Sequence, residues 1–182
     1  LGLYHDLGKA DQLFQKKLKE KPNLHVDHSY AGAKYLYNKI QMQLSTKGVD
    51  KAARIQFNDI TAYVISAHHG MFDIFDKDSE QFQYNKLRNR IAREMLDYHF
   101  DSDVKNFAHL LETKLEQYGY QNLEILIDKS FENYQQAISK LDCRDDSEEA
   151  YYQSCLVRLY LSLLRMLIFL TQSMLMSYLS IL

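Results

Sequence analysis

The sequence predicts an all-α fold, and two observations support this prediction. Almost nothing in the 182 residues interrupts a helix, since the chain contains one Pro and six Gly. Apolar residues recur at helical spacing nearly throughout, and no stretch alternates convincingly with the period of two that marks a strand. No internal repeat and no Gly- or Ser-rich linker divides the chain, so we expect residues 1–182 to form a single domain.

The helices can be placed in chain order from residues that cap or end them. A first helix is expected to end near Asp6, because Gly8 follows and can terminate it. Further helices are expected over residues 10–20, 28–44, 59–69, 84–98, 104–118, 123–141 and 148–182, with loops over 21–23 and 70–83. Asp27 and Asn58 are the predicted N-caps of the helices that begin at residues 28 and 59, and Gly70 would end the second of these.

The composition excludes several classes of protein. With 46% hydrophobic and 25% charged residues, the chain has enough apolar side chains for a core and does not resemble a disordered tail. A net charge of −2 excludes a general electrostatic attraction to nucleic acid, although it is compatible with a local basic groove. Cys143 and Cys155 form no metal or redox motif, which indicates a reducing compartment and a cytoplasmic location.

The last part of the chain is apolar. Every residue from Met166 to Leu182 is uncharged, and this stretch falls just short of the ~20 apolar residues that span a bilayer. Because Thr, Gln and Ser residues interrupt it, we expect a buried helix and no membrane anchor. The chain starts at Leu1 without a Met or a basic segment, so no signal peptide is expected.

The His residues form a pattern that is typical of a metal site. Four of the seven lie in short groups with other polar residues, and the members of these groups with ligand chemistry are His5, Asp6, His28, His68 and His69. Each group lies at an expected helix end. The adjacent pairs His5-Asp6 and His68-His69 (the second is called the His dyad below) are both predicted at helix C-termini, where unpaired carbonyls favour a cation. Imidazole and carboxylate together are the ligands of divalent ions such as Zn, Mn, Fe, Co or Ni.

Helical spacing predicts that these side chains point into the protein. Residues four apart share a helix face, and the rows are His28–Gly32–Leu36–Ile40–Leu44, Ile60–Val64–His68 and Thr61–Ile65–His69. Polar groups from three helices would then meet in the interior, where they are costly without a partner. A lone core His that bonds a backbone carbonyl is more common than a ligand, and His25, His99 and His109 fit that interpretation. The three groups together favour a metal site.

The ordered motifs resemble a known family. His5-Asp6-Leu7-Gly8-Lys9 resembles the signature of HD-superfamily metal-dependent phosphohydrolases. Together with Asp27-His28-Ser29 and Ala67-His68-His69-Gly70, it resembles the HD nuclease domain of the CRISPR-associated helicase-nuclease of type I systems. The resemblance covers residues 1 to about 75 at the level of motifs, and the rest matches only as helices of suitable length.

The resemblance implies an HD-domain-like helical bundle with metal between its helices. In such a domain one or two divalent ions (Mn, Fe, Co, Ni, Mg or Zn) activate the water that cleaves single-stranded DNA. Asp6 would bridge two metals and act in catalysis; His28, His68 and His69 would bind the second metal, and His5 the first. Lys9 would act in catalysis by facing a phosphate oxygen. The implied partners are single-stranded DNA, a helicase domain or subunit and a crRNA-guided surveillance complex, with no membrane.

Candidate DNA contacts follow from basic runs and aromatic residues. They are Lys16, Lys17, Lys19 and Lys21, then Lys86, Arg88, Arg90 and Arg93, and then Phe72, Phe75 and Phe82 in the loop after His69. Basic side chains could contact phosphates and the rings could stack on bases. The alternative is that the charged residues form solvated faces and that the Phe residues belong to the core.

The sequence departs from the family in two ligands. The family places a further His on a helix upstream of the His-Asp pair and an Asp near the end of its last helix, whereas no acidic residue follows Glu149. One nucleotide sequence that encodes residues 171–177 also encodes Ser-Ile-Asp-Ala-Asp-Val in another frame, so we interpret the last dozen residues as an out-of-frame remnant. We therefore expect a fragment that lacks its first helix, binds one metal detectably and has poor nuclease activity alone.

Three other functions are compatible with the sequence. An HD phosphohydrolase acting on nucleotides or cyclic nucleotides would use the same ligands, although the short gap between the first two groups favours the nuclease branch. A non-catalytic helical module that docks with the helicase or the surveillance complex would need no metal. A membrane-anchored helical protein has only the apolar tail in its support.

Overall fold

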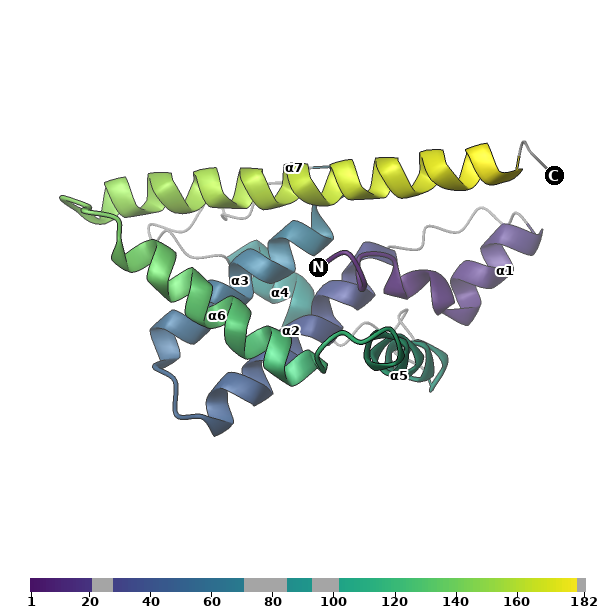
Figure 1. Cartoon of the computed structure of the whole chain (residues 1–182), viewed down its shortest axis with the longest axis horizontal. Helices are drawn as coiled ribbons and strands as arrows, with labels where there is room; N and C mark the ends of the chain where they lie inside the picture. Colours follow the sequence, from purple (N-terminus) through teal and green to yellow (C-terminus); the bar gives the residue numbers. More distant parts are fainter. Residues whose placement is uncertain (21–27, 71–84, 93–101, 180–182) are drawn as a thin grey trace.

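The computed structural model describes residues 1–20, 28–70, 85–92 and 102–179, and these residues are predominantly helical (Figure 1). The elements are η1 (Leu7–Ala10), a 3₁₀ helix, followed by α1 (Gln12–Glu20), α2 (His28–Thr46), α3 (Lys51–Ser66), α4 (Asn85–Ala92), α5 (Ser102–Gln117), α6 (Leu123–Ser139) and α7 (Asp146–Leu179). No strand occurs in the described ranges. The predicted all-α fold is confirmed.

Helices α2 and α3 form the centre of the molecule, and the other elements pack around this pair. Element η1 and helix α6 lie against α2, α4 contacts both central helices, α5 packs on η1, and α7 packs on α3. In Figure 1, α7 runs along one side of the molecule beside the remaining helices. Buried side chains from Tyr4 to Leu161 form one hydrophobic cluster. This cluster supports the expectation of a single domain, which stays a prediction.

Two glycines let the N-terminal segment lie directly on α2. A Cβ atom at Gly32 would stand 1.8 Å from the carbonyl oxygen of Tyr4, and one at Gly8 would stand 2.2 Å from the carbonyl oxygen of His28. Both distances are far inside van der Waals contact, so no other residue fits either position without a backbone shift. This close crossing places the turn that carries Asp6 beside the first residue of α2.

The structure corrects two predicted helix boundaries. Asp6 is the N-cap of η1 and follows a turn, so the expected helix ending at this residue is absent from the described N-terminal segment. Helix α3 begins at Lys51 and not at Asp59, because the Asp50 side chain caps it by accepting hydrogen bonds from the backbone N–H groups of Ala52 and Ala53. Asn58, the predicted cap, is buried inside α3.

The last helix differs from its prediction in burial. We expected a buried helix over the apolar tail, but Met166, Leu167 and Phe169 are 51%, 53% and 68% exposed. Only one face of α7 packs against the protein, through residues such as Leu161 and Leu164. Among the described residues, the stretch Ser147–Gln172 alone is long and apolar enough to cross a membrane, a test that core helices of soluble proteins also pass.

Some predictions fall outside the described residues. They concern the loop over 21–23 and most of the loop over 70–83, the Asp27 cap, His25, His99, Lys21, Arg93, Phe72, Phe75 and Phe82. Within the described part, Leu18 lies 60% exposed, and no residue of α1 is buried.

Candidate metal centre

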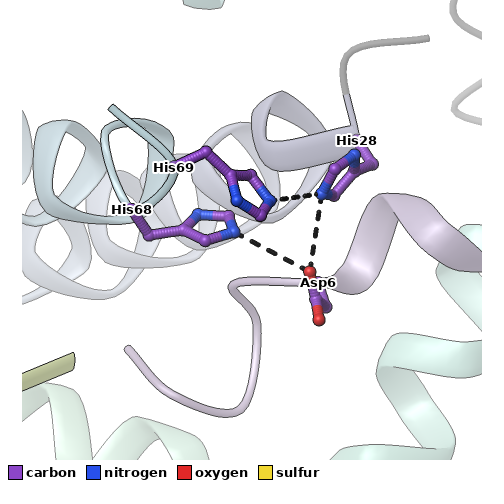
Figure 2. Close-up of side chains that lie close together, drawn as sticks. All are labelled: Asp6, His28, His68 and His69. Atoms are coloured by element: carbon purple, nitrogen blue, oxygen red, sulfur yellow. Dashed lines mark hydrogen bonds and ion pairs between the residues drawn. The ribbon is translucent and has the colours of Figure 1, made fainter. Parts of the chain in front are cut away.

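Three segments distant in sequence bring Asp6, His28, His68 and His69 together. Asp6 lies in the turn before η1, His28 begins α2, and the two other His residues follow the end of α3. One ligand atom from each of the four lies within 4.8 Å of the other three. Figure 2 shows the three imidazoles and the carboxylate converging on one point.

The four side chains meet through particular atoms. Asp6 Oδ1 lies 3.6 Å from His28 Nε2 and 3.8 Å from His68 Nε2, and His28 Nε2 lies 2.7 Å from His69 Nε2 (Figure 2). The solvent exposure of the four side chains increases across the site: His68 is buried, Asp6 and His28 are half-buried, and His69 is exposed. His69 therefore lies at the rim and not on a buried row as its spacing predicted.

His68 presents a ligand-ready nitrogen. Its Nδ1 lies 2.6 Å from the carbonyl oxygen of Ile65, and since a carbonyl can only accept, Nδ1 carries the proton. In the neutral ring Nε2 is then a bare acceptor. This atom and Asp6 Oδ1 are both buried without a hydrogen-bond partner. Two buried acceptors that face each other favour a cation between them, so the residues fit a divalent metal.

Electrostatics keep these groups in the forms that bind a metal. Burial, assisted by the charge of His69, lowers the pKa of His28 to about 4, and burial together with the charge of His68 lowers the pKa of His69. Burial works to raise the pKa of Asp6, but the His5 imidazole and the Lys9 ammonium outweigh it and hold that pKa well below its usual range. At neutral pH the centre therefore offers neutral imidazoles at His28 and His69 and an ionised carboxylate at Asp6.

The other carboxylate oxygen of Asp6 faces different residues. Oδ2 lies 2.7 Å from Lys9 Nζ and 3.1 Å from His5 Nε2. His5 Nδ1 lies 2.7 Å from the carbonyl oxygen of Gly2, which fixes the ring. Burial works to lower the pKa of His5, but its bonds with Asp6 and Gly2 raise it overall. His5 and Lys9 thus lie next to the group of four and not within it.

The sequence interpretation missed Arg165. Its Nε donates a hydrogen bond to the carbonyl oxygen of His68 at 3.0 Å, and its Nη2 donates to that of Ala67 at 3.2 Å. These carbonyls follow the end of α3, where helix carbonyls have no partner within the helix, and that of Ala67 also accepts from the Gly70 N–H at 3.0 Å. Arg165 therefore fixes the backbone that carries the His dyad. The sequence signal for this role was that Arg165 is the last charged side chain of an otherwise apolar tail.

The two basic runs that were predicted to contact DNA have different surroundings in the structure. Lys16 and Lys19 are exposed on α1, the helix that follows η1 directly, and Phe14 of the same helix contacts the His28 ring at a centroid distance of 5.1 Å. In the second run, Arg88 is bound to the buried Asp59 carboxylate. Arg88 thus has a structural partner, and its role as a DNA contact stays a prediction.

Comparison with known proteins gives one family. Residues 1–139 match the family described as "Cas3, HD domain". This match includes every residue of the metal centre and every helix through α6. No curated protein and no solved structure matches the chain.

Proposed function

Because the chain belongs to the Cas3 HD domain family of CRISPR-associated, metal-dependent phosphohydrolases, we propose that it is a metal-dependent nuclease that cleaves single-stranded DNA in antiviral defence. The observation that carries this proposal is the pair of buried, unpartnered acceptors, Asp6 Oδ1 and His68 Nε2. A purely structural cluster would satisfy these atoms with hydrogen-bond donors. A docking module without metal offers no reason to leave them bare.

The donor set indicates which ions the centre holds. Asp6, His28, His68 and His69 supply one carboxylate and three imidazoles. Such a set suits Mn, Fe, Co, Ni or Zn, whereas Mg prefers oxygen ligands. When bound, the ion supplies Lewis-acid chemistry: it lowers the pKa of water and draws charge from phosphoryl oxygens.

The residues of the chain would orient that chemistry. His68 is held in one tautomer by the Ile65 carbonyl, and Asp6 remains ionised, so neither group needs to reorganise when substrate arrives. Lys9 is 42% exposed and lies at the open side of the centre. We propose that its ammonium neutralises charge on a non-bridging phosphate oxygen. No Ser or Cys nucleophile is required.

Single-stranded DNA is the substrate that the surroundings favour. The exposed Lys16 and Lys19 of α1 can contact phosphates beside the centre, and Phe14 can support a base near His28. The centre opens to the surface at His69, which suits a polymer more than a small nucleotide that requires an enclosing pocket. We further propose that a helicase domain or subunit and a crRNA-guided complex deliver the strand in the cytoplasm.

A substrate panel tests the proposal. With Mn²⁺ or Ni²⁺, we expect slow cleavage of single-stranded DNA that stops with EDTA and in His68→Ala, while nucleotides and cyclic nucleotides stay intact. His109→Ala is the matched control, since His109 is exposed on α5 away from the cluster.

The alternatives give different results in the same panel. Preferential hydrolysis of nucleotides would replace the proposal with a nucleotide phosphohydrolase. No bound metal, together with a thermal stability that is indifferent to His68→Ala, would replace it with a non-catalytic docking module. For the proposed centre, metal at a hundred times its Kd should stabilise the fold by about 2.7 kcal/mol.

A further inference from the structure

His5 and Asp6 lie at the two central positions of a turn that Tyr4 and Leu7 close. The Leu7 N–H donates a hydrogen bond to the carbonyl oxygen of Tyr4 at 3.2 Å, which joins the residues on either side of the pair. Tyr4 is 2% exposed, and its carbonyl group lies against α2 at Gly32. The position of Tyr4 therefore helps to set the direction in which the turn presents the Asp6 carboxylate.

The side chain of Tyr4 reaches a third element of the fold. Its hydroxyl donates a hydrogen bond to Glu112 Oε1 on α5 at 3.3 Å. The same oxygen accepts from the hydroxyl of Tyr35 on α2 at 2.7 Å, and the two tyrosine rings pack with their centroids 5.5 Å apart. We infer that Glu112 is a positioning residue of the metal centre, which orients Asp6 through Tyr4.

Glu112 lies on a face of α5 where a carboxylate needs partners. Val104, Ala108 and Glu112 are spaced four residues apart, so they share one face of the helix, and the first two are 1% and 0% exposed. The Glu112 side chain itself is only 18% exposed, and a carboxylate in such a place is costly unless it is bonded. Its partners are the two tyrosine hydroxyls and the ammonium of Lys39 at 3.7 Å.

This inference rests on the proposed function and deepens it, because it adds a residue that acts on a metal ligand without touching metal or substrate. The contacts run from Glu112 Oε1 to the Tyr4 hydroxyl, and then from the Tyr4 carbonyl to the Leu7 N–H. Tyr35 offers a built-in comparison, since it bonds the same oxygen but lies inside α2, outside the turn. Loss of the Tyr4 hydroxyl should therefore disturb Asp6, whereas loss of the Tyr35 hydroxyl should not.

Metal affinity in matched variants tests the inference without measuring activity. The full chain is titrated with Mn²⁺ by isothermal calorimetry. Glu112→Leu and Tyr4→Phe should each weaken Mn²⁺ binding by about tenfold, the lower end of the range for groups that orient a metal ligand. Glu112→Gln keeps an oxygen that accepts from both hydroxyls, so it should bind Mn²⁺ like the wild type. Tyr35→Phe removes the other hydroxyl and should also bind like the wild type.

Two further measurements distinguish positioning from a general loss of stability. Urea denaturation of the metal-free proteins should show that Tyr35→Phe and Tyr4→Phe are both less stable than the wild type, because each loses a hydrogen bond to the same oxygen. The absorption spectrum of bound Co²⁺ reports the coordination geometry, and it should change in Tyr4→Phe and Glu112→Leu but not in Tyr35→Phe. The double variant Tyr4→Phe, Glu112→Leu should bind no more weakly than Glu112→Leu, because both changes remove one shared bond.

The possible results separate the inference from the proposed function. Unchanged Mn²⁺ affinity in a folded Tyr4→Phe, or an equal loss of affinity in Tyr35→Phe, would overturn the inference and leave the proposed function standing. If Glu112→Leu does not fold, Tyr4→Phe against Tyr35→Phe still decides. No Mn²⁺ bound by the wild type would count against the proposed function and against the inference with it.

Discussion

Arg165 on the last helix donates a hydrogen bond through Nε to the backbone carbonyl oxygen of His68 at 3.0 Å. The residue that offers the buried metal-facing nitrogen is therefore held from two directions. The Ile65 carbonyl accepts a hydrogen bond from its ring at Nδ1, and Arg165 binds its backbone. Groups that orient a ligand in this way commonly change metal affinity by 10–100-fold when removed.

Arg165→Met should weaken metal binding by about tenfold or more, because the backbone of the His dyad loses its anchor. The same change should lower the free energy of unfolding by about 1.5–3 kcal/mol, the usual contribution of hydrogen bonds from a charged group. Calorimetric titration and chemical denaturation measure the two effects. Arg165→Lys keeps the charge but loses the planar guanidinium that bonds two carbonyl oxygens at once, so this variant should also bind metal more weakly. Unchanged affinity in both variants would refute the role, and the exposed Arg158→Met is the control.

Gly32→Ala should destabilise the fold by about 3 kcal/mol or prevent folding, because the new Cβ would stand 1.8 Å from the Tyr4 carbonyl oxygen. Circular dichroism and chemical denaturation report the loss. Gly70→Ala is the matched control, since nothing lies within 4 Å of the position that its new methyl group would take, and we expect a change within about 0.5 kcal/mol. Equal stability of the two variants would show that the N-terminal segment does not cross α2 as closely as described.

Arg88→Met should cost about 3–5 kcal/mol at neutral pH, because it leaves the buried Asp59 carboxylate without its partner. Burial raises the pKa of Asp59 in the folded protein, although Arg88 opposes this. As the pH falls through that raised pKa, the folded state takes up the proton first, so the variant should recover stability. Recovery should be complete below the unfolded pKa of about 3.9.

Denaturation curves at several pH values measure this recovery for Arg88→Met. The double variant Asp59→Asn, Arg88→Met is the control, because its neutral amide cannot titrate and the difference should lose its pH dependence. A deficit in Arg88→Met that stays constant from neutral pH to about pH 4 would contradict the assignment to a buried carboxylate.

Asp50→Ala should lower the free energy of unfolding by about 1 kcal/mol, since the Asp50 carboxylate accepts from two N–H groups at the start of α3. Asp50→Ser retains a capping oxygen, so it should lower the free energy of unfolding by only a few tenths of the loss expected for Asp50→Ala. Urea denaturation of the three proteins measures the difference. If Ser and Ala cost the same, the side chain does not act as a cap.

The sequence predicted well those helices whose two ends are marked by helix-capping or helix-breaking residues. Helix α5 begins within two residues of its predicted start and ends one residue before its predicted end, because Asp101-Ser102-Asp103 and Gly119 mark its limits. The start of α3 was missed although its first two turns contain the apolar residues Ala52, Ala53, Ile55 and Phe57. Asp50 is also a possible N-cap by sequence, but Asn58 lies nearer to the apolar rows that start at Ile60 and Thr61. Asn58 was therefore predicted as the cap.

For the candidate site, helical spacing predicted the burial of His68 but not the exposure of His69. The row that ends at His69 continues only while the chain is helical, and α3 ends at Ser66. The surroundings of Asp6 were beyond the reach of spacing, because the crossing at Gly8 and Gly32 sets them through tertiary contact. The crossing sets which atom of Asp6 faces His28, whereas Lys9 lies beside Asp6 through the local 3₁₀ turn.

The hydrogen bonds from Arg165 to the backbone at His68 also determine when, during synthesis, the metal-binding group can reach its final geometry. His68 and Arg165 are 97 residues apart, and a ribosome adds about 5–20 residues per second. The set of four grouped side chains is therefore complete about 5–20 s before the residue that locks it is synthesised. During this interval the nascent chain carries a complete set of metal-binding groups on an unanchored backbone, so an ion captured early would be exchanged more readily than one bound by the finished protein.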